Sequence, residues 1–118
     1  MDEDAIEETV RSYYDRIDAG DHEGVFELFA ADVTYHRPGR EPIEGMDAFR
    51  EFYQEGRPLS AGIHEVHQVL VDGDAAAVRG RFTGEQDGEP VGFGFADVHR
   101  FEGGEIVERH TYTDRDTV

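Results

Sequence analysis

Two residues in the C-terminal third of the chain, Asp97 and His110, could perform acid/base chemistry together. Residues 91–101 alternate with a period of two, and Asp97 falls in the aromatic series. If Gly103-Gly104 forms a two-residue hairpin turn, His110 lies opposite Asp97 at about 5 Å. Burial among aromatic rings disfavours an ionised carboxyl group unless a partner compensates, and His110 is the expected partner. The pair is therefore predicted to form a functional site.

The face that His110 occupies depends on the register of this hairpin. The simple register also places Phe101 opposite Ile106. One bulged residue at the turn would instead bring Arg109 and Thr111 onto the aromatic face and send His110 outward. The sequence leaves both registers open, and the prediction uses the simple one.

Length and composition limit the classes of protein that this chain can represent. Its 118 residues are enough for one domain, residues 1–118, with one sizeable core. The absence of cysteine excludes disulfides, thiolate metal sites and cysteine nucleophiles. The acidic N-terminus does not resemble a signal peptide, and no apolar run reaches the length of a membrane span. A soluble cytoplasmic protein with no membrane partner is expected.

The charge balance is strongly acidic. The chain has 28 acidic and 11 basic residues, a formal net charge of −17, and every basic residue is arginine. Such a surface repels phosphate backbones, so no nucleic-acid partner is expected. The acidic residues are spread through every segment, which favours a surface adapted to high salt over an acidic patch for a basic partner.

Hydrophobic periodicity predicts helices in the first half of the chain and strands in the second. Helices are expected over residues 4–19 and 46–56, with a shorter one after Asp21 that includes residues 25–29. A short strand is expected at residues 33–36, before a loop. Four further strands are predicted at residues 63–71, 75–84, 90–101 and 105–113. This order is typical of an α+β fold with three N-terminal helices packed on one face of a curved antiparallel sheet.

Three stretches resemble a known protein family. They are AGDHEGVFELFAADVTYHRPG (19–39), EPIEGMDAFREFYQ (41–54) and FADVHRFEGGEIVERHTYTD (95–114). They resemble the SnoaL-like polyketide cyclase and ketosteroid isomerase-like branch of the nuclear transport factor 2-like superfamily. The resemblance covers nearly the whole chain and implies a cone-shaped fold, a small hydrophobic ligand and a homodimer formed through the sheet. Because the superfamily contains enzymes, binding modules and subunit adaptors, the fold alone does not assign a function.

The resemblance also implies roles for individual residues. Asp97 matches the protonated acid of the isomerase oxyanion hole, and Tyr13 matches the hydroxyl group that shares it, so that the two would stabilise an enolate. The position of the isomerase's carboxylate base is occupied by Arg37, which cannot accept a proton near neutral pH. His36, next to it, is a candidate substitute. In the SnoaL-like cyclases, an acidic residue and a histidine act on enolisable substrates, which would suit Asp97 with His110.

Further residues are predicted to contact the ligand or were considered as metal ligands. The expected ligand contacts are Tyr35, His36, Phe49, Tyr53, Phe95 and His99, although Tyr35 and Tyr53 are equally compatible with ordinary core packing. His64 and His67 are three apart in a predicted strand, so they point to opposite faces and do not chelate one ion. The simple hairpin register would bring His99 and His110 together near the carboxylates of Asp97 and Glu108, which would allow a metal site. The prediction nevertheless includes no metal and no other cofactor.

Two functions from different classes remain. The first is a small-molecule-binding cone that catalyses isomerisation, cyclisation or hydration of a hydrophobic carbonyl compound. In it Asp97 is the donor or acid, His110 its partner and base, and Tyr13 a second donor. The second is a non-catalytic ligand-binding or homodimerising module, which Arg37 in place of the usual base favours.

Overall fold

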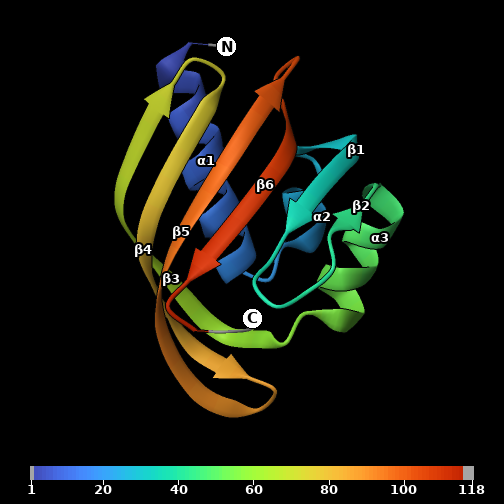
Figure 1. The fold of residues 1–118 in the computed structure, drawn as a ribbon, viewed down its shortest axis with the longest axis vertical. Coiled ribbons are helices and arrows are strands. Elements are labelled where there is room, and N and C mark those ends of the chain that lie inside the picture. Colours follow the sequence, from blue (N-terminus) through green and yellow to red (C-terminus); the bar gives the residue numbers. More distant parts are fainter. Residues whose placement is uncertain (1, 116–118) are drawn as a thin grey trace.

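The structure, a computed structural model, describes residues 2–115 and consists of helices packed on one strongly curled sheet (Figure 1). The helices are α1 (Glu3–Asp18), α2 (His22–Phe26), α3 (Met46–Glu51) and the π-helical turn η1 (Phe52–Gly56), which continues α3. The strands are β1 (Phe29–His36), β2 (Ile43–Glu44), β3 (Leu59–Asp72), β4 (Ala75–Gln86), β5 (Glu89–Glu102) and β6 (Glu105–Thr113). Among the described residues, no helix has both the length and the apolar character that a membrane crossing requires.

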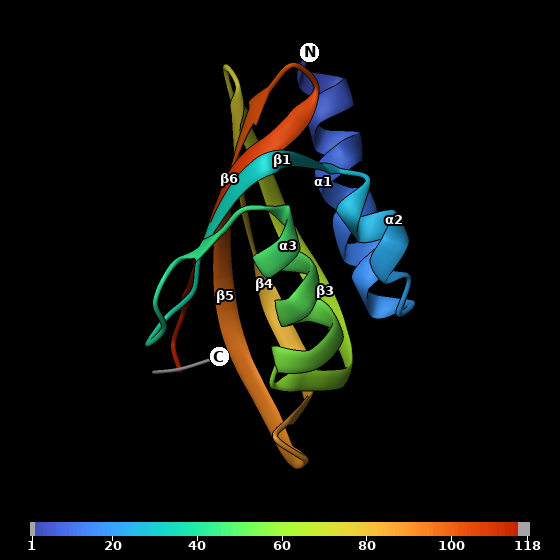
Figure 2. The same ribbon diagram turned by 90° about the vertical axis from the view of Figure 1, so that its right-hand side faces the viewer.

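The sheet has six strands in the order β2-β1-β6-β5-β4-β3. Strands β3 to β6 form the predicted antiparallel meander, and β1 also pairs with β2 in antiparallel fashion. Strand β1, however, runs parallel to β6, so the sheet is mixed and the expectation of a purely antiparallel sheet is wrong on this point. The helices lie on one face of the sheet (Figure 2), which confirms the predicted α+β cone.

Helix α1 lies across the concave face of the sheet and supplies much of the core. It begins after Asp2, whose side chain accepts a hydrogen bond of 2.7 Å from the amide of Ala5, and it ends before Gly20, which has a φ of 74°. Its buried residues recur at helical spacing and are Ile6, Val10, Tyr13, Tyr14 and Ile17. The same spacing therefore turns two adjacent tyrosines toward the interior.

The second helix is shorter than predicted. It ends at Phe26, and Phe29, which was expected in this helix, is the first residue of β1. The backbone amide of Ile106 donates to the carbonyl of Leu28 at 2.9 Å, and Phe29 pairs with Ile106. Pairing with β6 thus overrides the helical spacing, and it extends the predicted strand at residues 33–36 toward the N-terminus.

The hairpin of β5 and β6 contains a bulge with the effect that sequence analysis considered as the alternative, although it lies beyond the first pairs after the turn and not at the turn itself. Phe101 pairs with Ile106 as predicted, but the register shifts between Arg100 and Phe101. Beyond that shift Asp97 lies opposite Thr111, so the predicted pairing of Asp97 with His110 is wrong. The amide of Phe101 donates to the carbonyl of Asp74 in the turn between β3 and β4, which accompanies this irregularity.

Two further irregularities in β3 curl the sheet into a cone. The register of β3 and β4 shifts between Ser60 and Ile63 and again between Val66 and Gln68. Gly80 pairs with Val66 at the second shift, and a Cβ atom there would lie 2.0 Å from the carbonyl oxygen of Glu65. The curvature at this point therefore requires glycine.

We expect Gly80→Ala to lower the free energy of unfolding by about 2 to 3 kcal/mol, because the backbone of β3 must move to admit the methyl group. Urea titration monitored by circular dichroism measures this loss. Gly92→Ala is the matched control, since the nearest atom to its Cβ would be the end of the flexible Arg81 side chain, at 2.9 Å, and the nearest backbone atom would lie at an ordinary contact distance of 3.7 Å. Equal losses in the two variants would contradict the role of Gly80.

Candidate active site

A buried ion pair occupies the centre of the cone. Asp97 on β5 is 1% exposed and Arg109 on β6 is 3% exposed, and Arg109 Nη2 donates to Asp97 Oδ2 at 2.9 Å. Two hydroxyl groups complete the coordination of the carboxylate: Tyr14 donates to Oδ2 at 2.5 Å and Thr111 to Oδ1 at 2.6 Å. Three donors therefore hold this carboxylate in place.

The surroundings of Asp97 keep it ionised. Burial by itself raises the pKa of a carboxyl group, but the guanidinium of Arg109 outweighs this effect. With further contributions from His99, Thr111 and Tyr14, the pKa of Asp97 falls to about 2. At neutral pH Asp97 is therefore a carboxylate that accepts hydrogen bonds, in contrast to the protonated donor that the family resemblance implied.

Arg109 also organises a pair of tyrosines. Its Nη1 donates to Tyr13 at 2.8 Å and to Tyr53 at 3.0 Å, and the two phenolic oxygens lie 2.5 Å apart. Burial raises the pKa of both tyrosines, so both keep their protons. Only one of these two protons lies between the oxygens, and no contact within residues 2–115 uses the other. The pair can therefore donate one hydrogen bond to a ligand oxygen.

A second chain of hydrogen bonds reaches Asp97 from the end of β1. Arg37 Nη1 donates to the Tyr35 hydroxyl at 2.5 Å, and Tyr35 lies 3.0 Å from Thr111 Oγ1. Since Thr111 gives its only proton to Asp97, Tyr35 must be the donor to Thr111. Burial would raise the pKa of Tyr35, but the guanidinium groups of Arg109 and Arg37 outweigh it and lower the pKa.

His64 on β3 forms a dyad with Asp18, the last residue of α1. Asp18 Oδ1 lies 2.6 Å from His64 Nδ1, and Asp18 Oδ2 accepts the backbone amide of His64 at 2.8 Å. Because a carboxylate only accepts, Nδ1 carries the ring proton and Nε2 presents a lone pair. Burial lowers the pKa of His64 although Asp18 raises it, so the imidazole is neutral at pH 7. A neutral, oriented imidazole of this kind is suited to accept a proton.

The dyad lies where an open cleft meets the interior. An inner cavity of about 20 Å³ is lined by Tyr13, Tyr35, Arg37, Arg57, Leu59, His64, Phe93, Phe95, Asp97, Arg109 and Thr111. A cleft of about 370 Å³ is lined by Ile17, Asp18, Gly20, His22, Tyr53, Arg57, Leu59, Ser60, Gly62, His64 and Phe82. Arg57, Leu59 and His64 belong to both. The cleft has the size of a small-molecule site, whereas the inner cavity accommodates one water or one polar group of a ligand.

Comparison with known protein families identifies the family to which this chain belongs. The sequence profile of the SnoaL-like domain matches residues 10–109. The chain belongs to the SnoaL-like family. Its fold is accordingly the nuclear transport factor 2-like cone, as the resemblance implied.

Solved structures share this SnoaL-like fold. Bal32a from a soil-derived mobile gene cassette is 25% identical, with a TM-score of 0.81 over 94% of this chain and 90% of that one. A proposed SnoaL-like polyketide cyclase from Jannaschia sp. CCS1 is 21% identical, with a TM-score of 0.79 over 91% and 83% of the two chains. An LEH-like epoxide hydrolase from M. tuberculosis is 18% identical, with a TM-score of 0.79 over 91% and 80%.

The structure brings together some of the residues predicted for the site of this SnoaL-like protein and separates others. Tyr13, Tyr35, Phe95 and Asp97 line the inner cavity, and Tyr53 lines the cleft. Phe49 is fully buried and packs on Tyr53, with 4.8 Å between ring centroids. His99 is fully buried behind Tyr14, whose oxygen accepts from His99 Nε2 at 3.2 Å.

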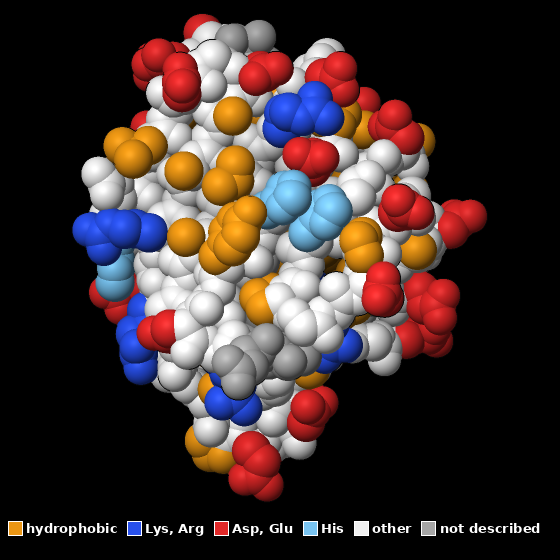
Figure 3. Space-filling view, viewed as in Figure 1, with side chains coloured by type: hydrophobic (Ala, Val, Ile, Leu, Met, Phe, Trp, Pro, Cys, Tyr) orange, Lys and Arg blue, Asp and Glu red, His pale blue; other side chains and the backbone are white. Residues whose placement is uncertain are grey.

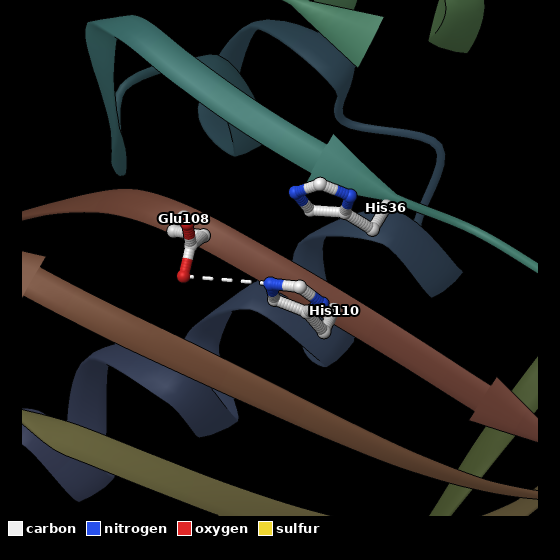
Figure 4. A group of neighbouring side chains, drawn as sticks. All are labelled: His36, Glu108 and His110. Atoms are coloured by element: carbon white, nitrogen blue, oxygen red, sulfur yellow. Dashed lines mark ion pairs between the residues drawn. The ribbon is translucent and has the colours of Figure 1, made fainter. Parts of the chain in front are cut away.

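Two predicted histidines lie on the outer face of the sheet, away from Asp97. His36 on β1 and His110 on β6 stack on each other there, with ring centroids 4.1 Å apart (Figure 4). The bulge in the β5–β6 hairpin shifts the alternation of β6 and turns Arg109 inward in place of His110. His110 therefore does not partner Asp97, and the grouping of His99 with His110 considered as a metal site is also excluded.

Sequence reasoning missed the residues that complete the site of this SnoaL-like protein. Arg109 and Thr111 appeared only in the alternative register, and Tyr14, rather than Tyr13, donates to Asp97. His64 was considered only together with His67. The local pattern gave no signal that His64 points inward, because its neighbour Ile63 is apolar yet 68% exposed, and nothing in the pattern joined His64 to Asp18.

We expect the stability of the folded protein to fall with pH partly because of His99. Burial, followed by the charge of Arg109, lowers the pKa of His99 from 6.5 to about 3, and His99 Nδ1 has no partner among the described residues. Between these pH values the unfolded chain binds a proton that the folded chain does not, so stability decreases as pH falls from 6.5 toward 3. One such proton corresponds to about 1.4 kcal/mol per pH unit.

Urea unfolding of the wild type and His99→Gln between pH 5 and 6.5 measures this contribution. The variant should show a smaller slope of unfolding free energy against pH, since the unfolded glutamine binds no proton. His67→Gln, which replaces a surface histidine, is the control. Parallel slopes for the wild type and His99→Gln would show that His99 titrates normally.

Proposed function

We propose that this SnoaL-like protein catalyses proton transfer on a small, largely apolar carbonyl compound bound in the cleft. The observation that carries the proposal is the Asp18–His64 dyad at the junction of the cleft and the polar interior. His64 is the general base. Asp97, which sequence analysis proposed as the acid, instead holds Arg109 and Thr111 in place.

The proposed step transfers a proton from the carbon next to the carbonyl group to His64 Nε2. The electron pair of the broken C–H bond moves into the carbonyl group, and negative charge develops on its oxygen. The spare phenolic proton of the Tyr13–Tyr53 pair, polarised by Arg109, stabilises this oxyanion. Return of the proton to another carbon gives isomerisation, and attack of the enolate carbon on a second carbonyl gives cyclisation.

The walls of the cleft combine apolar and polar groups, which suits a carbon skeleton that carries a carbonyl group. Ile17, Leu59 and Phe82 contribute apolar surface, while Arg57 at the junction supplies a cation. Because the inner cavity is small, only the polar group of the substrate reaches the tyrosine pair and its carbon skeleton stays in the cleft. The proposed polyketide cyclase and the LEH-like epoxide hydrolase among the similar structures are consistent with this use of the cone.

We expect the protein to accelerate hydrogen–deuterium exchange next to the carbonyl group of at least one member of a panel of enolisable ketones and lactones. Proton NMR in D₂O measures this exchange without knowledge of the final product. His64→Gln, whose amide nitrogen is not a base, should slow exchange by about 10² to 10⁴-fold. Asp18→Asn should slow it less, because the imidazole remains but its tautomer and orientation are no longer fixed.

His67→Gln is the matched control, since His67 belongs to the same strand and its side chain lies 3.2 Å from the exposed Glu65. Binding is measured separately: a compound of the panel that raises the melting temperature of the protein binds to it. If such a compound exchanged no faster with protein, or equally fast with wild type and His64→Gln, the catalytic role of His64 would be wrong.

A second proposal concerns assembly, and it rests on the outer face of the sheet. Leu70, Ala77 and Val98 are paired in turn across β3, β4 and β5, and form one row. Leu70 is 58% and Val98 37% exposed, and Figure 3 shows apolar side chains gathered over this part of the sheet. A second copy of the chain, carrying the same apolar row, would cover it as the family resemblance implied.

We expect sedimentation velocity in molar KCl, where screening reduces repulsion between acidic chains, to show a dimer. Val98→Asp should weaken it by about tenfold or more, because dimerisation would bury an unpaired carboxylate. Ile63→Asp is the control: Ile63 is 68% exposed but pairs with Thr83, six residues along β4 from Ala77. A wild-type monomer at micromolar concentration would contradict the proposal.

A further inference from the structure

Three metal-ligating side chains meet on the outer face of the sheet, on the side opposite the cleft. They are His36 from β1 and Glu108 and His110 from β6, and one ligand atom from each lies within 4.8 Å of the other two (Figure 4). We propose that these residues bind a divalent transition-metal ion such as Zn²⁺. The proposal is independent of the proton-transfer reaction, because none of the three lines the cleft or the inner cavity.

The backbone fixes the positions of all three ligands. His36 and His110 are directly paired in the parallel ladder of β1 and β6. Glu108 precedes His110 by two residues, so both side chains point to the same face of β6. The bulge in the β5–β6 hairpin is what places this face of β6 outward. Two strands, rather than a loop, therefore hold the ligands, which limits the cost of ordering them on binding.

Closing the site around an ion requires at least one imidazole ring to turn, because the in-plane lone pairs of two nearly parallel rings do not point at one atom. The imidazole rings are stacked with centroids 4.1 Å apart and an interplanar angle of 11°, and His110 Nε2 lies 3.4 Å from Glu108 Oε1. A tetrahedral zinc site has bonds of about 2.0 to 2.2 Å to nitrogen and oxygen, so its ligand atoms lie about 3.3 Å apart. The side chains of His110 and Glu108 are 32% and 36% exposed, which leaves them room to rotate.

The chemistry of the ligands selects the class of metal. Two imidazoles and one carboxylate suit zinc, nickel or copper, whereas magnesium and calcium prefer sites made of oxygen alone. The formal net charge of −17 raises the local concentration of any cation. Three protein ligands also leave one coordination position open to water or an external ligand.

Arg100 on β5 competes with a metal ion for Glu108. Arg100 Nε lies 3.8 Å from Glu108 Oε1, and Arg100 Nη1 lies 3.4 Å from Glu102 Oε2. A bound cation must displace this guanidinium or share the carboxylate with it. Removal of the Arg100 charge should therefore strengthen metal binding at this site.

Isothermal titration with ZnCl₂, after removal of metal by EDTA, tests the proposal. We expect the wild type to bind one Zn²⁺ per chain, and His36→Ala and His110→Ala each to weaken binding by about tenfold or more, since loss of a direct ligand costs at least as much as loss of an outer partner. Arg100→Gln should bind more tightly than the wild type. Circular dichroism of the variants checks that these half-buried positions tolerate the substitutions.

His67→Ala is the matched control, because His67 Nε2 lies 3.2 Å from Glu65 Oε1 and repeats the histidine–carboxylate contact without a second imidazole. It should bind zinc as the wild type does. The proposal is overturned if the wild type takes up no zinc at 100-fold excess over protein. It is equally overturned if His36→Ala and His110→Ala bind zinc as the wild type does.

Discussion

The buried ion pair of Asp97 and Arg109 is the interaction on which the interior of this protein depends. Removing two opposite charges from water costs several kcal/mol for each ion, and their mutual attraction offsets this only when further hydrogen bonds satisfy both groups. Here Tyr14 and Thr111 satisfy the carboxylate, and Tyr13 and Tyr53 receive the guanidinium. The network ties α1, η1, β5 and β6 together. An apolar core of the same volume would often be at least as stable, so a polar interior of this kind is better explained by function than by stability.

The same ion pair determines which residue is free to act as a base. Because Arg109 and three further groups lower the pKa of Asp97 to about 2, Asp97 is a weak proton acceptor at neutral pH. Arg37, at the position of the isomerase base, is a permanent cation. His64 is different: its pKa is lowered by burial, its Nδ1 is held by Asp18 so that Nε2 has the lone pair, and the residue lines the cleft. Asp97 and Arg109 neutralise each other in the ion pair, so we assign proton transfer to the neutral imidazole of His64.

Local sequence patterns predicted the fold and the inward direction of several site residues, but not their partners. The change of period from helical to two predicted the order of helices and strands, and alternation along β5 predicted that Asp97 faces inward. One extra residue in β6 then turned Arg109 inward and His110 outward. Periodicity cannot reveal this, because a bulge reverses the faces of a strand without changing its composition. The contact of Asp18 with His64 depends on how the end of α1 docks on β3. The stacking of His36 on His110 likewise depends on the parallel pairing of β1 with β6, which the predicted antiparallel sheet did not contain.

The protonation state of His64 tests the central claim most directly. Nitrogen-15 NMR of protein labelled at its histidines distinguishes a protonated ring nitrogen from one with a lone pair, and the spectrum of His64→Gln identifies the His64 signals by their absence. The account predicts a neutral ring at pH 7 with the proton on Nδ1 and the lone pair on Nε2. A doubly protonated ring, or a proton on Nε2, would contradict the assignment of His64 as the base.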